Sequence, residues 1–90
     1  MTDVVELLKS KEHLGNAREH YLLGFATALI RSCKLDVKEF TVFNASNVVT
    51  LMYIVMRLRT MSDNEPDNYD LAVTSCILED EIKKVITGDN

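Results

Sequence analysis

The sequence predicts an all-α fold, a small up-down bundle of about four helices in one domain that covers residues 1–90. Apolar residues recur with the 3.6-residue period of a helix along most of the chain. The only proline lies in a polar stretch between two such segments, as expected for a loop. A chain of ninety residues is too short for two domains and buries only about 60–65% of its unfolded surface. We therefore also expect a homo-oligomer, most simply a dimer, to complete the core.

The first predicted helix begins near Asp3 and ends at Gly15. Asp3 and Glu6 have the three-residue spacing of a capping box, in which two side chains satisfy free N–H groups of the first turn. Gly15 supplies the permissive backbone at which helices commonly end.

The second predicted helix is the most regular element. Asn16 and Glu19 repeat the capping pattern at its start. Tyr21 begins its apolar side, which continues with the helical period through Leu22, Phe25, Ala26, Leu29, Ile30 and Cys33.

The segment that follows begins with Asp36 and Glu39, again three residues apart, which predicts one more helical turn over residues 37–43. Residues 40–43 are rich in strand formers, so a short extended piece is the alternative. A lone strand would have no partner, which favours a short helix or an ordered connection.

The third predicted helix is capped by Asn44 or Asn47 and ends near Met61. One apolar stripe is formed by Val48, Leu51, Met52, Val55 and Leu58, and Ile54 and Met56 widen it. A helix with so broad an apolar surface is central in the core or lies at a subunit contact.

Residues 62–67 form the one evident loop, with Pro66 inside it. Asp67 is expected to cap the fourth helix, with Asp70 three residues on, and Gly88 to end it. The apolar side of this helix is formed by Leu71, Ala72, Ser75, Leu78, Ile82 and Val85. The short connections between the four helices predict the up-down topology.

The net charge of −4 is distributed unevenly along the chain. Residues 1–60 hold eight Lys and Arg against six Asp and Glu, whereas residues 61–90 hold two Lys against eight acids. This balance argues against a nucleic-acid partner. The C-terminal third of the chain could face a basic partner, and a solvated helix face followed by an acidic loop explains the same charges without one.

A cytoplasmic location is expected. No apolar run reaches the roughly 18 residues of a membrane span, and the first residues lack the basic start of a secretory signal. Cys33 and Cys76 both lie within apolar helical patterns, which predicts two reduced core thiols. A disulfide that joins two helices is the alternative.

Acidic side chains near two helix starts suggest a sparse magnesium site. Asp67 and Asp70 share a helix face, and Glu19 could face them across a bundle. Helix capping explains the same three residues without a metal.

Other metal and phosphate motifs do not fit the sequence. An EF-hand loop from Asp63 would need glycine and glutamate at the positions of Asn68 and Thr74. The two histidines and two cysteines lack the spacing of zinc ligands, and the three glycines are too scattered for a phosphate loop.

The third and fourth predicted helices resemble those of a known family. One matching segment is Val48–Arg59, an apolar stretch that ends in a basic residue, and the other is Pro66–Ala72, with the sequence Pro-Asp-Asn-Tyr-Asp-Leu-Ala. Leu14-Gly15-Asn16 resembles the glycine-containing start of the family's first long helix. These segments resemble small phage-borne relatives of the all-α, MazG-like nucleotide pyrophosphohydrolases. The resemblance covers residues 14–82, and about twenty positions carry it.

The resemblance implies a helical fold that assembles through its helices and binds magnesium and a nucleoside triphosphate. Asp67 and Asp70 would match two acids of the family, and Arg59 its basic residue. The dense EExxE-type motif of an earlier helix is reduced here to Glu19, and Met56 stands where a lysine is usual. So few carboxylates cannot hold the ions that polarise a triphosphate, which indicates a relative that kept the scaffold and lost the chemistry.

Our leading hypothesis is a non-catalytic, phage-encoded protein that regulates or inhibits a host protein by binding to it, without a cofactor. Tyr69 is the expected aromatic anchor of the contact. The candidate contact residues are Asp63, Glu65, Asp67, Tyr69 and Asp70.

Two alternatives are kept. The first is a magnesium-dependent nucleoside triphosphate pyrophosphohydrolase, with Glu19, Asp67 and Asp70 on the metal and Arg59 on phosphate. The second is an acidic DNA mimic that inhibits a nucleic-acid-binding enzyme, whose binding would be strongly sensitive to salt.

Overall fold

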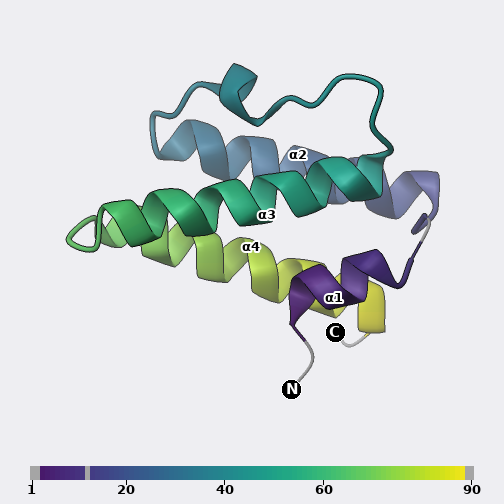
Figure 1. Cartoon of the computed structure of the whole chain (residues 1–90). Coiled ribbons are helices and arrows are strands. Elements are labelled where there is room, and N and C mark those ends of the chain that lie inside the picture. Colours follow the sequence, from purple (N-terminus) through teal and green to yellow (C-terminus); the bar gives the residue numbers. More distant parts are fainter. Residues whose placement is uncertain (1–2, 12, 89–90) are drawn as a thin grey trace.

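Four α-helices and one short 3₁₀ helix make up the part of the chain that the computed structural model describes, residues 3–11 and 13–88. The elements are α1 (Val4–Lys9), α2 (Asn16–Ser32), η1 (Val37–Phe40), α3 (Asn47–Asn64) and α4 (Tyr69–Thr87). No strand occurs within these ranges. The predicted all-α bundle is therefore confirmed (Figure 1).

The chain connects α2 to α3 by a crossover rather than by the expected short loop. Residues 33–46 return along the bundle, so α2 and α3 run in the same direction (Figure 1). At one end of the bundle, Glu19 in the first turns of α2 accepts a hydrogen bond from Asn47, the first residue of α3. At the other end, Cys33 after α2 meets Thr74 near the start of α4, so α4 runs antiparallel to α2.

The core lies between the three long helices and the short α1, which packs against α3 and α4. The crossover contributes Phe40 of η1 to this core. Each fully buried aliphatic side chain stabilises the fold by about 1.5–3 kcal/mol relative to exposure. The buried apolar residues are Val4, Val5, Leu8, Leu22, Ala26, Ile30, Phe40, Val48, Leu51, Ile54, Val55, Leu58, Leu71, Leu78 and Ile82.

The N-terminal boundaries differ from the predicted ones. Helix α1 ends at Lys9 rather than at Gly15, and the Asp3 side chain does not cap it because its carboxylate pairs with Arg59. Gly15, with a φ of 97°, is the N-cap of α2, so Asn16 is the first helical residue and not the cap. Glycine adopts this φ without the steric cost that a Cβ would bring.

The later helix starts are also capped by neighbours of the predicted residues. Ser46, and neither Asn44 nor Asn47, caps α3, because its hydroxyl accepts a hydrogen bond from the Val49 N–H at 3.2 Å. Asn68, rather than Asp67, caps α4 by accepting from the Leu71 N–H at 3.3 Å. Amides and hydroxyls at N-caps satisfy free N–H groups as well as carboxylates do.

Helix α3 runs on to Asn64, beyond the predicted end at Met61, and the loop shrinks to residues 65–68. Gly88 ends α4 in the left-handed conformation, as predicted. The segment after Asp36 is the short helix η1 and not a strand, and the Asp36 carboxylate caps it by accepting from the Lys38 N–H.

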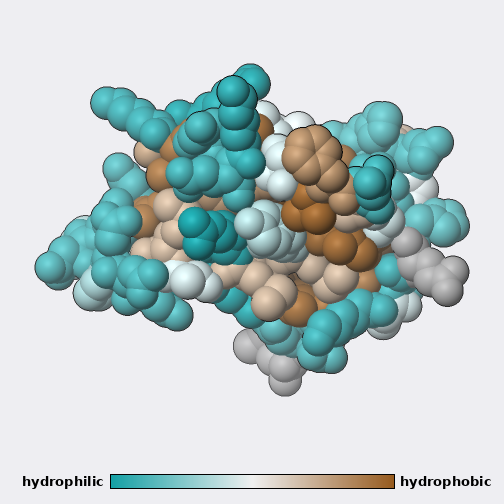
Figure 2. All heavy atoms as spheres, turned by 45° about the horizontal axis from the view of Figure 1, so that its top comes forward, coloured by the Kyte–Doolittle hydropathy of each residue, from teal (hydrophilic) through white to brown (hydrophobic). Residues whose placement is uncertain are grey.

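Several apolar side chains lie outside the core. Met56 of α3 is exposed, together with Val49 on the same helix and Phe43 in the crossover. Figure 2 shows apolar surface gathered on the side of the molecule that carries the crossover. Among the described residues, no helix has the length and apolar character needed to cross a membrane.

Candidate functional site

The corner between α3 and α4 presents the predicted contact residues at the surface. We call Asp63, Glu65, Asp67, Tyr69 and Asp70 the acidic corner, and all five side chains are exposed. Tyr69 is 81% exposed, an unusual position for a large aromatic ring. The structure thus brings these residues together on one short stretch of surface.

Local hydrogen bonds hold the backbone of this corner in one conformation. The Glu65 N–H bonds to the carbonyls of Met61 and Ser62 and closes α3, and the Asn68 N–H bonds to the Glu65 carbonyl at 2.9 Å. The Asn68 side chain then caps α4. The four carboxylates are therefore displayed from a fixed turn, and Asp67 and Asp70 also lie at the positive end of the α4 dipole.

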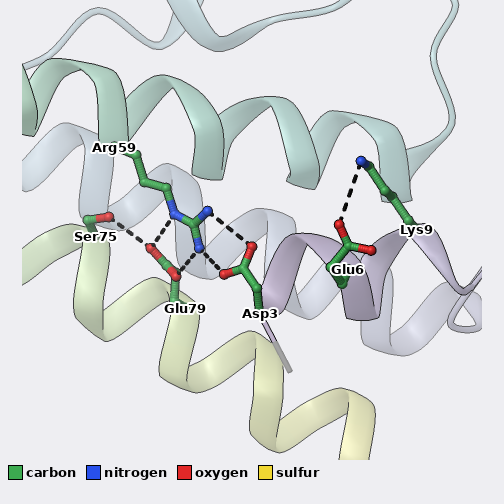
Figure 3. Close-up of polar contacts among 6 residues, drawn as sticks. All are labelled: Asp3, Glu6, Lys9, Arg59, Ser75 and Glu79. Atoms are coloured by element: carbon green, nitrogen blue, oxygen red, sulfur yellow. Dashed lines mark hydrogen bonds and ion pairs between the residues drawn. The ribbon is translucent and has the colours of Figure 1, made fainter. Parts of the chain in front are cut away.

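Arg59, the candidate phosphate contact, is occupied by two carboxylates within the protein (Figure 3). Its Nε and Nη2 donate to the Glu79 carboxylate of α4 at 3.1 and 2.6 Å. Its Nη1 donates to Asp3 before α1 at 3.2 Å, and Nη2 pairs with the same carboxylate. Ser75 donates to Glu79 from the neighbouring turn at 3.2 Å.

This arrangement shifts the pKa of Arg59 and the pKa of Asp3 in opposite directions. The hydrogen bonds that Arg59 donates to Glu79 are the main reason why the pKa of Arg59 is raised, and the bond from Arg59 lowers the pKa of Asp3. The cluster ties α1, α3 and α4 together in its charged form. The N–H donors of the Arg59 guanidinium are already bonded to the two carboxylates, in a cluster that we call the Arg59 clip. The expected role of Arg59 in phosphate binding would therefore require the ion pairs of this clip to break.

Glu19, a candidate metal ligand, is a buried structural acid. Its side chain is 5% exposed, and its carboxylate accepts from the Leu14 N–H at 2.7 Å and from the Asn47 amide at 2.9 Å. The hydrogen bond from Leu14 is the main reason why the pKa of Glu19 is lowered, and the bond from Asn47 adds to it. These bonds favour the charged form despite burial.

The three candidate metal ligands do not meet, which corrects the expectation that Glu19 faces Asp67 and Asp70. Glu19 lies at the start of α2, whereas Asp70 lies beside Cys33 just after the end of α2. These places are separated by 14 residues of helix, about 21 Å. Among the described residues, no group of three or more His, Cys, Asp or Glu side chains could hold a metal ion.

The two cysteines are free thiols in different surroundings. Cys33 is half-buried, with its sulfur 2.9 Å from the Thr74 hydroxyl. Cys76 is exposed on α4, so the expectation of two core thiols is wrong for Cys76, because α4 turns that position away from the core.

One surface was missed by the sequence analysis. Tyr69, Val73 and Ile77 are exposed on α4 and follow one another at four-residue spacing. This second row was detectable as an apolar repeat beside the core stripe, because residues four apart share a helix side. Tyr21 of α2 lies on the same side of the bundle and donates to Glu81 of α4 at 2.7 Å.

Comparison with known proteins returned no relative: no family model, curated protein or solved structure matches the chain.

Proposed function

We propose that this chain is a non-catalytic protein that acts by binding another protein through the acidic corner. The observation that carries the proposal is the 81% exposure of Tyr69 among four exposed carboxylates on a fixed turn. An exposed aromatic ring is costly in water and becomes favourable when a partner covers it, which is why aromatic residues dominate binding hot spots.

The charges of the corner define the chemistry of the partner. Within the described residues, the ion pairs involve Lys9 and Arg59, and none involves a carboxylate of the corner. Those carboxylates are therefore available to a basic surface. We propose a partner with a hydrophobic pocket for the Tyr69 ring and Lys or Arg side chains around it.

The resemblance to MazG-like enzymes adds to this proposal the regulation or inhibition of a host protein by a phage-encoded chain. A cytoplasmic location belongs to the same proposal, and the two free thiols agree with a reducing compartment. The identity of the partner decides these finer points.

The decisive experiment compares matched aromatic variants in a pull-down, followed by calorimetry with the captured protein. Tyr69→Ala should weaken binding by about 2 kcal/mol or more, as for a hot-spot residue. Phe43→Ala is the matched control, because Phe43 is equally exposed, at 86%, but lies in the crossover. A partner that is lost with Phe43→Ala and kept by Tyr69→Ala would move the binding site away from the corner.

Charge reversal tests the second half of the proposal. The double variant Asp63→Lys/Glu65→Lys should weaken the same complex, and Glu39→Lys, an exposed acid elsewhere, should leave it unchanged. Binding that is indifferent to the double variant would contradict a basic partner. An acidic DNA mimic would instead capture a nucleic-acid-binding enzyme that nucleic acid displaces, with strong salt sensitivity.

Thermal unfolding separates the interaction proposal from the pyrophosphohydrolase alternative. A ligand that binds only the folded state raises the unfolding midpoint by mass action. We expect no shift with magnesium and nucleoside triphosphates, because Glu19 and Asp70 lie at opposite ends of α2, which is about 21 Å of helix, and Arg59 is held by Asp3 and Glu79. A clear rise that Asp70→Asn abolishes would restore the enzymatic reading.

A further inference from the structure

The side of the molecule formed by α2 and α4 has an apolar centre. Val73 and Ile77 of α4 are 53% and 42% exposed. They line a hollow between the two helices together with Leu29, Cys33 and Thr74. We call this surface the α2–α4 face. Covering these side chains would remove apolar area from water, which favours a partner.

Charges of opposite sign lie at the two ends of the same face. Asp70 stands seven residues before Ile77, and Lys84 stands seven residues after it. Seven residues are close to two helical turns, so all three side chains project from nearly the same side of α4, about 10.5 Å apart. Arg18 of α2 lines a second hollow with Lys84 and strengthens the basic end.

This pattern is self-complementary under twofold symmetry. An axis through Ile77, perpendicular to α4, places a second α4 antiparallel to the first. Asp70 then faces Lys84 of the partner subunit, and Lys84 faces Asp70 of the partner subunit. A parallel arrangement would instead oppose like charges, which is unfavourable.

Beside the axis, the arrangement places an apolar side chain opposite an acid whose carboxylate already has a hydrogen-bond partner. Four residues before Ile77 stands Val73, and four residues after it stands Glu81, so these two positions oppose one another across the axis. The Glu81 carboxylate is already turned to the Tyr21 hydroxyl at 2.7 Å. The half-exposed aromatic ring of Tyr21 lies near Phe25. Because Tyr21 is bonded to Glu81, this ring also lies opposite Val73 of the partner subunit.

We propose that the α2–α4 face is the interface of a homodimer in which a second copy of this chain docks antiparallel about Ile77, with Asp70 and Lys84 forming reciprocal ion pairs. The rival apolar surface has Phe43 in the crossover and Val49 and Met56 on α3, a helix whose charged residues are Arg57, Arg59 and Asp63. Neither Val49 nor Met56 lies midway between an acid and a base of that helix. The proposal goes beyond the acidic corner. The two surfaces share Asp70, whereas Asp63, Glu65, Asp67 and Tyr69 take no part in the ion pairs of the dimer.

The test measures the mass of the full chain in solution by light scattering and sedimentation equilibrium. The wild type should be a dimer, and Ile77→Glu should be monomeric with an unchanged helical circular dichroism spectrum. Met56→Glu, a matched charge on an exposed apolar residue of α3, should leave the dimer intact. A wild-type monomer, or a dimer broken by Met56→Glu and not by Ile77→Glu, would overturn the proposal.

Charge exchange tests the antiparallel geometry and remains informative if Ile77→Glu fails to fold. Asp70→Lys and Lys84→Asp should each raise the dimer dissociation constant about tenfold or more, because each opposes like charges. The combined variant Asp70→Lys/Lys84→Asp should recover most of the loss, since opposite charges face one another again. If the combined variant lost as much dimer affinity as the two single variants lose together, the reciprocal pairing would be refuted. Partner capture by the acidic corner is measured separately, so failure of one proposal leaves the other standing.

Discussion

The Glu19 carboxylate and the Asn47 amide meet at 2.9 Å where α2 and α3 both begin, although 28 positions separate them in the sequence. The same carboxylate accepts the N–H of Leu14 at 2.7 Å. One buried acid therefore joins the chain before α2, the first turns of α2 and the first residue of α3. The Glu19 carboxylate thus holds the end of the crossover, where α3 begins, against the start of the parallel helix α2.

Removing this acid should destabilise the whole fold. Glu19→Ala leaves the Leu14 N–H and the Asn47 amide without their partner, and unmade buried hydrogen bonds are costly. We expect a lower thermal midpoint for Glu19→Ala, a smaller loss for Glu19→Gln, which keeps one acceptor oxygen, and little change for the exposed Glu39→Ala. Calorimetry on the three variants checks the order. Equal midpoints for Glu19→Ala and Glu39→Ala would contradict a structural role.

Stability should fall in acid because of Glu19 and Asp3. Both pKa values are lowered in the folded chain, chiefly by the Leu14 N–H for Glu19 and by Arg59 for Asp3. The unfolded chain therefore takes up these protons first as the pH falls. The contribution of these two ionised carboxylates to the free energy of unfolding is complete above the ordinary carboxylate pKa. It is lost below that pKa, between about pH 5 and pH 3. Urea unfolding across this range should show the advantage of wild type over Glu19→Gln shrinking, and a constant advantage would disprove the assignment.

The Arg59 clip should contribute more than the exposed pair of Lys9 and Glu6, which lie 3.9 Å apart (Figure 3). Arg59→Met removes the N–H groups that donate to Glu79 and Asp3, and the free energy of unfolding should fall by about 1–3 kcal/mol. Lys9→Met should cost no more than about 0.5 kcal/mol, because both partners are exposed. Denaturant titrations give both values. Hydrogen exchange in α1 should rise in Arg59→Met alone, and similar losses in the two variants would argue against the clip.

Two glycines should respond to alanine in opposite directions. Gly24 lies within α2 with open space around its added Cβ, so Gly24→Ala should stabilise the chain by about 0.5–1 kcal/mol. Gly15 has a φ of 97°, so Gly15→Ala should destabilise it by about 1 kcal/mol or more. Equilibrium unfolding in urea measures both. A destabilising Gly24→Ala would contradict the open space around that position.

The inner positions of the predicted helical stripes form the core, whereas Tyr21 and Met56, at the edges of their stripes, are exposed. Leu22, Ala26 and Ile30 of α2, and Leu51, Val55 and Leu58 of α3, are buried where their 3.6-residue period placed them. The left-handed Gly88 also ended α4 as expected. These features depend on neighbours within one helix, so local spacing contains the needed information.

The capping residues and helix ends were predicted less well, because several adjacent residues are each able to cap the same helix. The N-cap of α3 could be formed by Asn44, Ser46 or Asn47, since all three residue types suit this position. Ser46 forms it because the path of the crossover places this residue at the start of the helix. Asp3 lost its capping role because Arg59, 56 positions away, offers a stronger partner. Competition of this kind is invisible in a local pattern.

The sequence by itself determined the all-α class, the three long helices and the exposed acidic corner, since periodicity and charge are local properties. The tertiary structure decided which acids meet. It placed Glu19 with Asn47 at one end of the bundle, Asp70 beside Cys33 at the other, and Glu79 with Arg59 and Asp3 at one junction of three helices. The physical reason is the crossover of residues 33–46, which makes α2 and α3 parallel and so sets which helix ends are neighbours.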